Sequence, residues 1–301
     1  MRNKTKFDIN KDTVFHNLFE QSSTFTQMFR DMGHQSYCYD LQNEYGKTDF
    51  IIDIFKHIEI AFQIITEYDL KKLEGRAKYT GWSIQAMYNE NLFFKMHPDR
   101  DMILAFFPCD FFSELNDMVF SGYSVQRYDE NGNTIPNTTK ENVLRIIDRI
   151  GKRKEYFAIF TKFCFVVEQL GIPTIIENPY GCYGGNYLLK HSLWKPQKDK
   201  NGKFIYDKDR TLFGCYMPKP TFYIPINFHM EENFSGLYTD KNNNPKKSVL
   251  YQGKGKERSE ISPTYAKNFY KRFLMPPETK PNIQSQSNPQ QTIFDIIGEE
   301  N

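Results

Sequence analysis

Short apolar runs rich in β-branched and aromatic residues alternate with helical patterns along much of the chain. Runs of this length and composition are typical of buried strands. The pattern predicts five strands, over Val14–Phe19, Ser36–Leu41, Phe50–Ile54, Met102–Phe107 and Thr174–Glu177. Strands that alternate with helices indicate an α/β fold, with a mostly parallel sheet and helices on both of its faces.

Two helical segments are the clearest. Ser23–Met32 is followed by Gly33, a residue typical of the position just after a helix. Lys140–Leu170 carries apolar residues at helical spacing and is followed by Gly171. Within this longer segment we expect two helices, with a break near Gly151.

Changes in composition divide the chain into parts. Residues 67–101 form a charged insertion with Trp82, which we expect to be helical and to cover the site as a lid. After Met275 the sequence is rich in Pro, Ser, Gln and Asn, which is typical of a disordered linker. We therefore expect one domain over residues 1–274, a linker over 275–289 and a terminal peptide over 290–301.

Charge and cysteine content narrow the class of protein. The 301 residues include 39 Lys and Arg against 37 Asp and Glu, a balance that permits nucleic-acid contact through a local patch without requiring it. The five cysteines are odd in number and far apart, which fits neither a disulfide framework nor a zinc site. The polar start and the lack of a long apolar run predict a cytoplasmic protein without signal peptide or membrane span.

A lone thiol follows the fourth predicted strand. The apolar run ends in Phe107-Pro108-Cys109, and ligands of open α/β sheets bind at the carboxyl ends of strands. Cys109 is therefore a candidate nucleophile, although free cysteines are often buried and inert. The fifth strand ends in a similar way, with Glu177-Asn178-Pro179.

In their order along residues 14–274, these motifs resemble those of the DNA cytosine-5 methyltransferases, in a divergent bacterial or phage form. Phe107-Pro108-Cys109, with Phe112-Ser113 after it, resembles the nucleophile motif, and Glu177-Asn178-Pro179 resembles the glutamate motif. Residues 18–25 occupy the place of the cofactor-binding Phe-x-Gly-x-Gly loop, and residues 258–263 that of the last motif. The resemblance implies a Rossmann-like methyltransferase fold.

The same resemblance implies that S-adenosyl-methionine is the cofactor and that no metal is needed. Asp40 stands in the place of the acid that binds the ribose, and Asp53 in that of the acid that contacts the adenine amino group. The implied cofactor-binding residues are Phe19, Asp40, Asp53, Pro108 and Ser259.

The chemistry of the family explains the residue types in these motifs. Carbon 5 of cytosine is a poor nucleophile, so the Cys109 thiolate would first add to carbon 6 of the ring. Glu177 would hold the ring at N3 and at the exocyclic amine. A base inside duplex DNA is out of reach, so it would be flipped into the pocket. Further substrate contacts are expected from Asn178, Lys219 and Ser113.

The sequence also departs from the family. Gln21 and Ser23 replace the two loop glycines, which narrows the space for a sharp turn beside the cofactor. Asp110 stands directly after the thiol, where the family has glutamine, and its charge disfavours the thiolate. The Gln-x-Arg motif is not evident, and Arg210 and Lys219 are the nearest cations, either as phosphate contacts or as surface charges.

The segment left for target recognition is short. It covers residues 222–257, which is little for a domain with its own core. Five lysines between residues 241 and 256 predict a phosphate-contacting loop or, alternatively, a solvated turn. We therefore expect low sequence specificity or dependence on a partner.

Two other functions fit the same residues. A methyltransferase fold without catalysis would act as a DNA-binding or interaction module, which the loop substitutions and Asp110 favour and the retained Cys109 and Glu177 oppose. An enzyme that modifies a free pyrimidine nucleotide would need no large recognition segment. The fold alone does not decide among these functions.

A last motif follows the linker. Gln290, Ile293 and Phe294 lie in a Gln-Gln-Thr-Ile-Phe-Asp-Ile-Ile sequence that resembles the peptide docking into bacterial sliding clamps. The alternative is a short helix that packs back on the domain. The expected partners are therefore DNA and, through this peptide, a sliding clamp, with no membrane.

Overall fold

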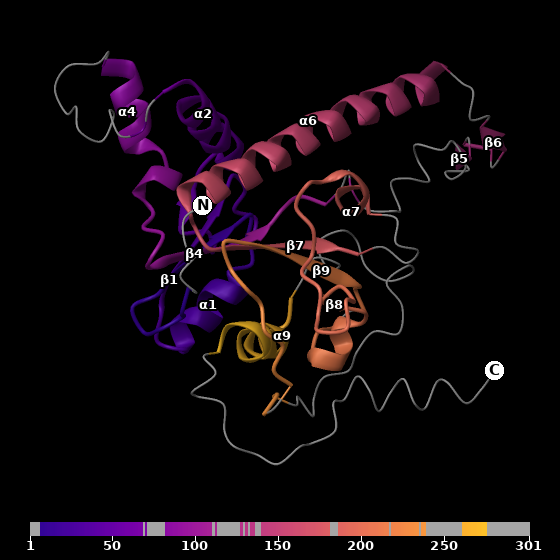
Figure 1. Ribbon diagram of the computed structural model, residues 1–301. Coiled ribbons are helices and arrows are strands. Elements are labelled where there is room, and N and C mark those ends of the chain that lie inside the picture. Colours follow the sequence, from indigo (N-terminus) through magenta and orange to yellow (C-terminus); the bar gives the residue numbers. More distant parts are fainter. Residues whose placement is uncertain are drawn as a thin grey trace, which may run out of the picture.

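The computed structural model describes residues 7–68, 70, 82–109, 112, 127–128, 130–131, 133–135, 140–180, 186–216, 218–234, 236–238 and 261–275. Seven strands form one sheet in the order β3-β2-β1-β4-β7-β9-β8 (Figure 1). These strands are β1 (Val14–Leu18), β2 (Gln35–Asp40), β3 (Phe50–Ile51), β4 (Asp101–Phe106), β7 (Thr174–Pro179), β8 (Tyr206–Asp207) and β9 (Thr221–Ile226). A separate ladder pairs β5 (Arg127–Tyr128) with β6 (Thr134–Ile135).

Five strands, β3, β2, β1, β4 and β7, run parallel to one another, whereas β9 is antiparallel to both β7 and β8. Leu18 at the end of β1 lies opposite Tyr39 and Ala105, and Phe106 at the end of β4 lies opposite Glu177. The carboxyl ends of the parallel strands therefore meet at one edge of the sheet.

Helices cover both faces of the sheet (Figure 1). The helices are α1 (Thr24–Asp31), α2 (Ile54–Glu67), α4 (Trp82–Glu90), α6 (Lys140–Leu170), α7 (Tyr187–His191) and α9 (Pro263–Phe269). Short 3₁₀ turns form η1 (Phe93–Lys95) and η2 (Arg210–Phe213), and a π-helical turn forms η3 (Tyr270–Leu274).

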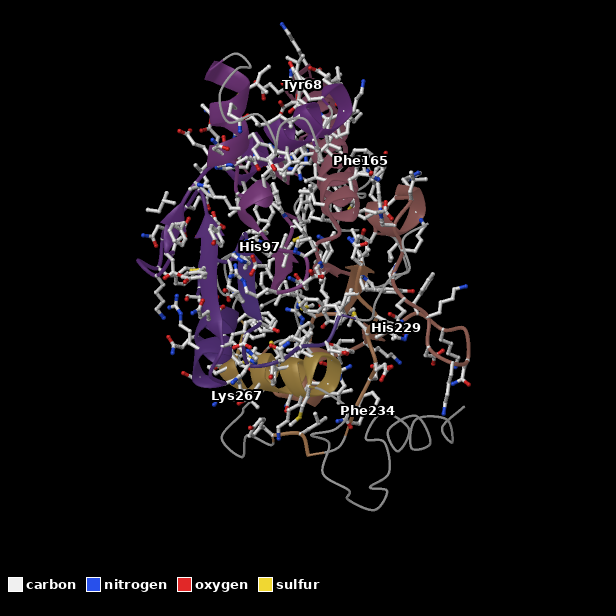
Figure 2. All side chains as sticks on the ribbon, turned by 60° about the vertical axis from the view of Figure 1, so that its left-hand side comes forward. Tyr68, His97, Phe165, His229, Phe234 and Lys267 are labelled. Carbon is white, nitrogen blue, oxygen red and sulfur yellow. The ribbon has the colours of Figure 1, made fainter. Side chains whose placement is uncertain are left out.

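Side chains fill the space on both sides of the sheet (Figure 2). Strand β4 shows how, because its residues alternate between the two faces. Ile103 and Ala105 belong to the core under α2 and α6, while Met102 and Leu104 belong to the core under α1 and α9. The fold is thus a three-layer α/β arrangement compatible with a Rossmann-like fold.

The structure confirms the mostly parallel sheet and corrects several details. The third strand has only two residues, and Asp53 caps α2 by accepting a hydrogen bond from the Lys56 N–H (3.1 Å). The predicted break at Gly151 is wrong, because α6 is continuous. One helical glycine costs only about 1 kcal/mol, which 31 residues of helix tolerate.

The segment predicted for target recognition is also shorter than expected. Its first residues, Phe222–Ile226, belong to β9 inside the sheet. Helix α2 was not predicted, because its apolar start was assigned to the preceding strand. No helix in the described ranges combines the length and apolar character that crossing a membrane requires.

A buried polar cluster joins the C-terminal helix to strands β8 and β9. Asp207 accepts hydrogen bonds from the hydroxyls of Tyr223 and Tyr265 (both 2.6 Å) and from Arg272 Nη1 (2.7 Å). Arg272 also contacts Glu232 (3.1 Å). Burial and the neighbouring Asp207 raise the pKa of both tyrosines well above their usual value, so both remain neutral donors.

We expect Arg272→Met to lower the free energy of unfolding by about 3–5 kcal/mol, because it leaves the Asp207 carboxylate buried without its cation. Denaturant unfolding measures the change. Lys152→Met is the matched control, since Lys152 forms an exposed pair with Asp148 on α6, and losing such a pair costs about 0.5 kcal/mol or less. Equal losses in the two variants would contradict this account of the cluster.

Candidate active site

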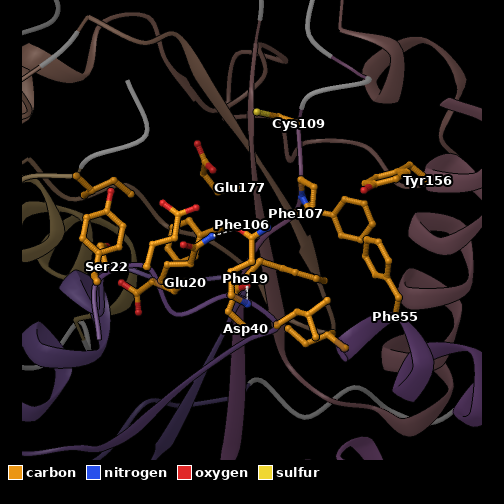
Figure 3. Close-up of a pocket in the computed structure, with 18 of the residues that line it drawn as sticks. Phe19, Glu20, Ser22, Asp40, Phe55, Phe106, Phe107, Cys109, Tyr156 and Glu177 are labelled. Atoms are coloured by element: carbon orange, nitrogen blue, oxygen red, sulfur yellow. Dashed lines mark hydrogen bonds between the residues drawn. The ribbon is translucent and has the colours of Figure 1, made fainter. Parts of the chain in front are cut away.

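A pocket of about 620 Å³ lies at the carboxyl edge of the parallel strands (Figure 3). Its walls come from the segments that follow β1, β2, β3 and β4, together with residues of β7, α6 and η2. Cys109 and Glu177 lie in the upper part of the view, and Glu20 and Asp40 in the lower part (Figure 3).

Most of the predicted site residues line this one pocket. They are Phe19, Asp40, Asp53, Pro108, Cys109, Glu177 and Lys219. Asn178 does not line it: its side chain is fully buried and donates to the Phe107 carbonyl (3.0 Å), so its position argues against the expected substrate contact. Ser113, Ser259, Asp110 and the lysines of 241–256 lie outside the described residues, as does the terminal peptide.

Cys109 and Glu177 come from neighbouring strands. Phe106 and Glu177 are paired in the β4–β7 ladder, and Cys109 follows three residues after Phe106. Cys109 is partly buried, and its carbonyl accepts a hydrogen bond from the Phe112 N–H (3.0 Å). The sheet register therefore brings the thiol and the acid into one pocket.

Arg210 is the partner of Glu177. It lies on η2, forms a buried ion pair with the Glu177 carboxylate, and has its guanidinium 5.0 Å from the centre of the Tyr265 ring. Burial opposes the charge, but Tyr265 and Glu177 outweigh it and raise the pKa of Arg210, so the cation persists. The sequence indicated Arg210 only as a phosphate contact or surface charge. The residues around an arginine in the sequence do not indicate whether its side chain is buried.

The loop after β1 contains two residues with positive φ, a conformation that favours glycine, although neither residue is glycine. Ser23 has φ +57° and Phe19 has φ +62°, both in the left-handed region. Non-glycine residues adopt this region at a cost of about 1–2 kcal/mol. Gln21, at the other glycine position, has no positive φ and donates to Gln42 Oε1 (2.7 Å). The substitutions therefore do not prevent the turn, although Gln21 lines the pocket.

Glu20 is a pocket residue that the sequence analysis missed. Its carboxylate accepts hydrogen bonds from the N–H groups of Phe25 (2.6 Å) and Thr26 (3.2 Å) and from the Thr26 hydroxyl (2.7 Å). These groups form the N-terminus of α1, where a helix favours negative charge. Burial raises the pKa of Glu20 to about 7 in spite of these hydrogen bonds. The available signal in the sequence was an acid four residues before Thr24, the first residue of α1.

The lower part of the pocket combines carboxylates with an aromatic wall. Burial raises the pKa of Asp40, whose side chain accepts from the Gln42 N–H (2.8 Å). Phe19 contacts Phe55 and Phe107, with ring centres 5.6 and 5.3 Å apart. An apolar wall beside buried acids suits an aromatic ligand that carries hydroxyl or amino groups.

Comparison with known proteins identifies no family: no protein-family model and no curated protein sequence matches this chain. In the described part of the chain, no three His, Cys, Asp or Glu side chains are grouped to hold a metal ion.

We expect Glu20 to make stability depend on pH. Its folded pKa of about 7 lies above the ordinary 4.5, so the folded state holds a proton that the unfolded chain loses between these values. The unfolding free energy of the wild type should therefore fall relative to Glu20→Gln as pH rises from about 4.5 to 7, and level off above. Denaturant unfolding at several pH values measures this difference; a difference independent of pH would count against the prediction.

Proposed function

We propose that this chain is an S-adenosyl-methionine-dependent DNA cytosine-5 methyltransferase in which Cys109 is the nucleophile. The observation that carries the proposal is the meeting of Cys109 and Glu177 in one pocket, beside Asp40 and Asp53. These are the four positions at which the motifs predict nucleophile, base-holding acid and cofactor contacts. The strand order, with β9 antiparallel between β7 and β8, is compatible with such a fold.

The charges of the pocket support this cofactor over a dinucleotide. In dinucleotide-binding sheets the first helix receives the pyrophosphate at its N-terminus. Here the Glu20 carboxyl group already accepts the hydrogen bonds at the start of α1, so a phosphate would find these N–H groups occupied. S-adenosyl-methionine has no phosphate and carries a sulfonium and an ammonium group, which suit Glu20, Asp40 and Asp53.

In the proposed reaction the base edge is held by Glu177. One oxygen of the Glu177 carboxyl group, which is oriented by Arg210, accepts a hydrogen bond from the exocyclic amine of cytosine, and the other oxygen, protonated when the base binds, donates its proton to N3. The Cys109 thiolate attacks carbon 6, the C5–C6 double bond opens, and carbon 5 becomes nucleophilic. S-adenosyl-methionine, when bound, supplies the methyl group. A base, solvent in the simplest case, then takes the proton from carbon 5, the electrons of that C–H bond re-form the C5–C6 double bond, and the Cys109 thiolate leaves carbon 6. N3 returns its proton to Glu177.

Lys219 lines the pocket in addition to Arg210, so the pocket wall carries two cationic side chains. This second cation supports a nucleic-acid substrate. A cation at this position suits the phosphate next to a flipped nucleotide. A free pyrimidine nucleotide also carries a phosphate, so an experiment must decide whether the substrate is DNA or the free nucleotide.

We expect a covalent adduct between the protein and DNA that contains 5-fluorocytosine, in the presence of labelled S-adenosyl-methionine. Fluorine blocks the loss of the proton from carbon 5 and traps the Cys109–carbon 6 bond. The adduct should disappear in Cys109→Ala and persist in Cys164→Ala, which removes a buried thiol of α6 that does not line the pocket.

The other outcomes distinguish the alternative functions. No cofactor binding and no adduct on any DNA would refute the proposal. Retention of DNA without cofactor would indicate a binding module instead. Methyl transfer to deoxycytidine monophosphate but not to DNA would indicate an enzyme of free nucleotides.

The terminal peptide carries a separate proposal, that it tethers the enzyme to a sliding clamp. Its support is the Gln290, Ile293 and Phe294 pattern, which follows a segment with the composition of a linker. We expect a bacterial sliding clamp to retain the wild type and to lose Phe294→Ala by at least about tenfold in affinity. Phe7→Ala, at the other end of the chain, is the control; clamp binding that survives the Phe294 change would remove the idea.

A further inference from the structure

The backbone before Cys109 is held by a side chain instead of the sheet. The β4–β7 ladder ends with Phe106 opposite Glu177. Two residues further, Pro108 has no N–H and cannot extend a ladder. The Asn178 side chain takes over at this point, because its Nδ2 donates to the Phe107 carbonyl (3.0 Å).

A second asparagine fixes the orientation of the first. Asn186 Oδ1 accepts from the Leu188 N–H (2.8 Å) and so caps α7. Its Nδ2 then donates to Asn178 Oδ1 (3.0 Å) and to the Pro179 carbonyl (2.6 Å). Because the cap makes Asn186 Nδ2 the donor, Asn178 must present its oxygen to Asn186 and its Nδ2 to Phe107. Both side chains are fully buried, so water does not replace these bonds.

The same helix also holds the backbone after Cys109. The Tyr187 N–H donates to the Phe112 carbonyl (3.0 Å), and the Phe112 N–H donates to the Cys109 carbonyl (3.0 Å). Phe112 is buried, and its ring stacks on Tyr187 with centres 6.4 Å apart. The start of α7 thus contacts the chain after the thiol directly, and it is linked to the chain before the thiol through Asn178.

We propose that Asn178 and Asn186 are positioning residues for Cys109, which fix its backbone so that the thiol stays in the pocket beside Glu177. The two amides form a relay from the N-cap of α7 to the carbonyl two residues before the thiol. This inference rests on the proposed role of Cys109 as nucleophile. It also explains why Asn178 lies outside the pocket wall although the residue before it, Glu177, lines the pocket.

Asn186→Asp tests the relay while keeping the helix cap. Aspartate still accepts from the Leu188 N–H, but it places an acceptor against Asn178 Oδ1. Asn178 must then turn its Nδ2 toward residue 186, and its oxygen faces the Phe107 carbonyl, which releases the segment. Asn186→Ser is the second variant, because serine retains a cap but does not reach Asn178.

Two measurements on folded protein report on the thiol. The first is the rate at which iodoacetamide alkylates Cys109, followed by mass spectrometry of its peptide, which needs no substrate. We expect this rate to rise at least about threefold in Asn186→Asp, because a released segment exposes the partly buried thiol more often. The second is the rate of adduct formation on 5-fluorocytosine DNA, which we expect to fall about 10–100-fold while cofactor affinity stays within twofold.

Asn268→Ala is the matched control. Asn268 on α9 is a buried asparagine whose Nδ2 donates to two carbonyls, of Phe213 and Tyr238, away from Cys109. Its loss should lower thermal stability without changing either rate. If Asn186 had only a structural role, Asn186→Asp and Asn186→Ser would behave like Asn268→Ala, with lower thermal stability and unchanged alkylation and adduct-formation rates.

The outcomes separate this inference from the proposed function. Unchanged alkylation in both folded Asn186 variants would overturn the positioning role, as would faster alkylation with unchanged adduct formation. Faster alkylation in a protein whose wild type forms no adduct with any DNA would support the positioning role and refute the methyltransferase proposal.

Discussion

The register of the five parallel strands is the constraint on which the pocket depends. Because Leu18 lies opposite Ala105, and Phe106 opposite Glu177, the segments that follow these strands leave the sheet at one edge. The order reverses at β1, which has β2 on one side and β4 on the other, and such a point leaves a crevice at the strand ends. A shift of one residue in any pairing would turn that strand's side chains to the opposite face.

Buried charged side chains connect the carboxyl edge of the sheet to helix α9 and the turn η3 that follows it. A buried arginine is costly unless an acid compensates it, and Arg210 and Arg272 have Glu177 and Asp207 as partners. Tyr265 links the two pairs, because its ring lies against Arg210 and its hydroxyl donates to Asp207. Helix α9 therefore supports the site although it follows Glu177 by more than eighty residues.

The sequence predicted the sheet well and the site in part. Strand assignments succeeded because buried parallel strands are continuous apolar runs, and residues just after such runs, Cys109 and Glu177, must reach one edge. The third strand was predicted too long, because an apolar run such as Ile51–Ile54 does not distinguish a strand end from a helix start. Asn178 was assigned to the substrate by its motif, but its buried side chain donates to the Phe107 carbonyl instead.

The order of apolar runs and the residues that end them were determined by the sequence alone, because period and composition are local properties. Which polar groups face one another was decided only by the tertiary structure. Three buried pairs illustrate this: Glu177–Arg210, Asp207–Arg272 and Asn178–Asn186. The two members of each pair are brought together by the packing of the folded chain, which the local sequence does not reveal. Glu20 shows the same limit, since its sequence position does not reveal that burial at the start of α1 would raise its pKa to about 7.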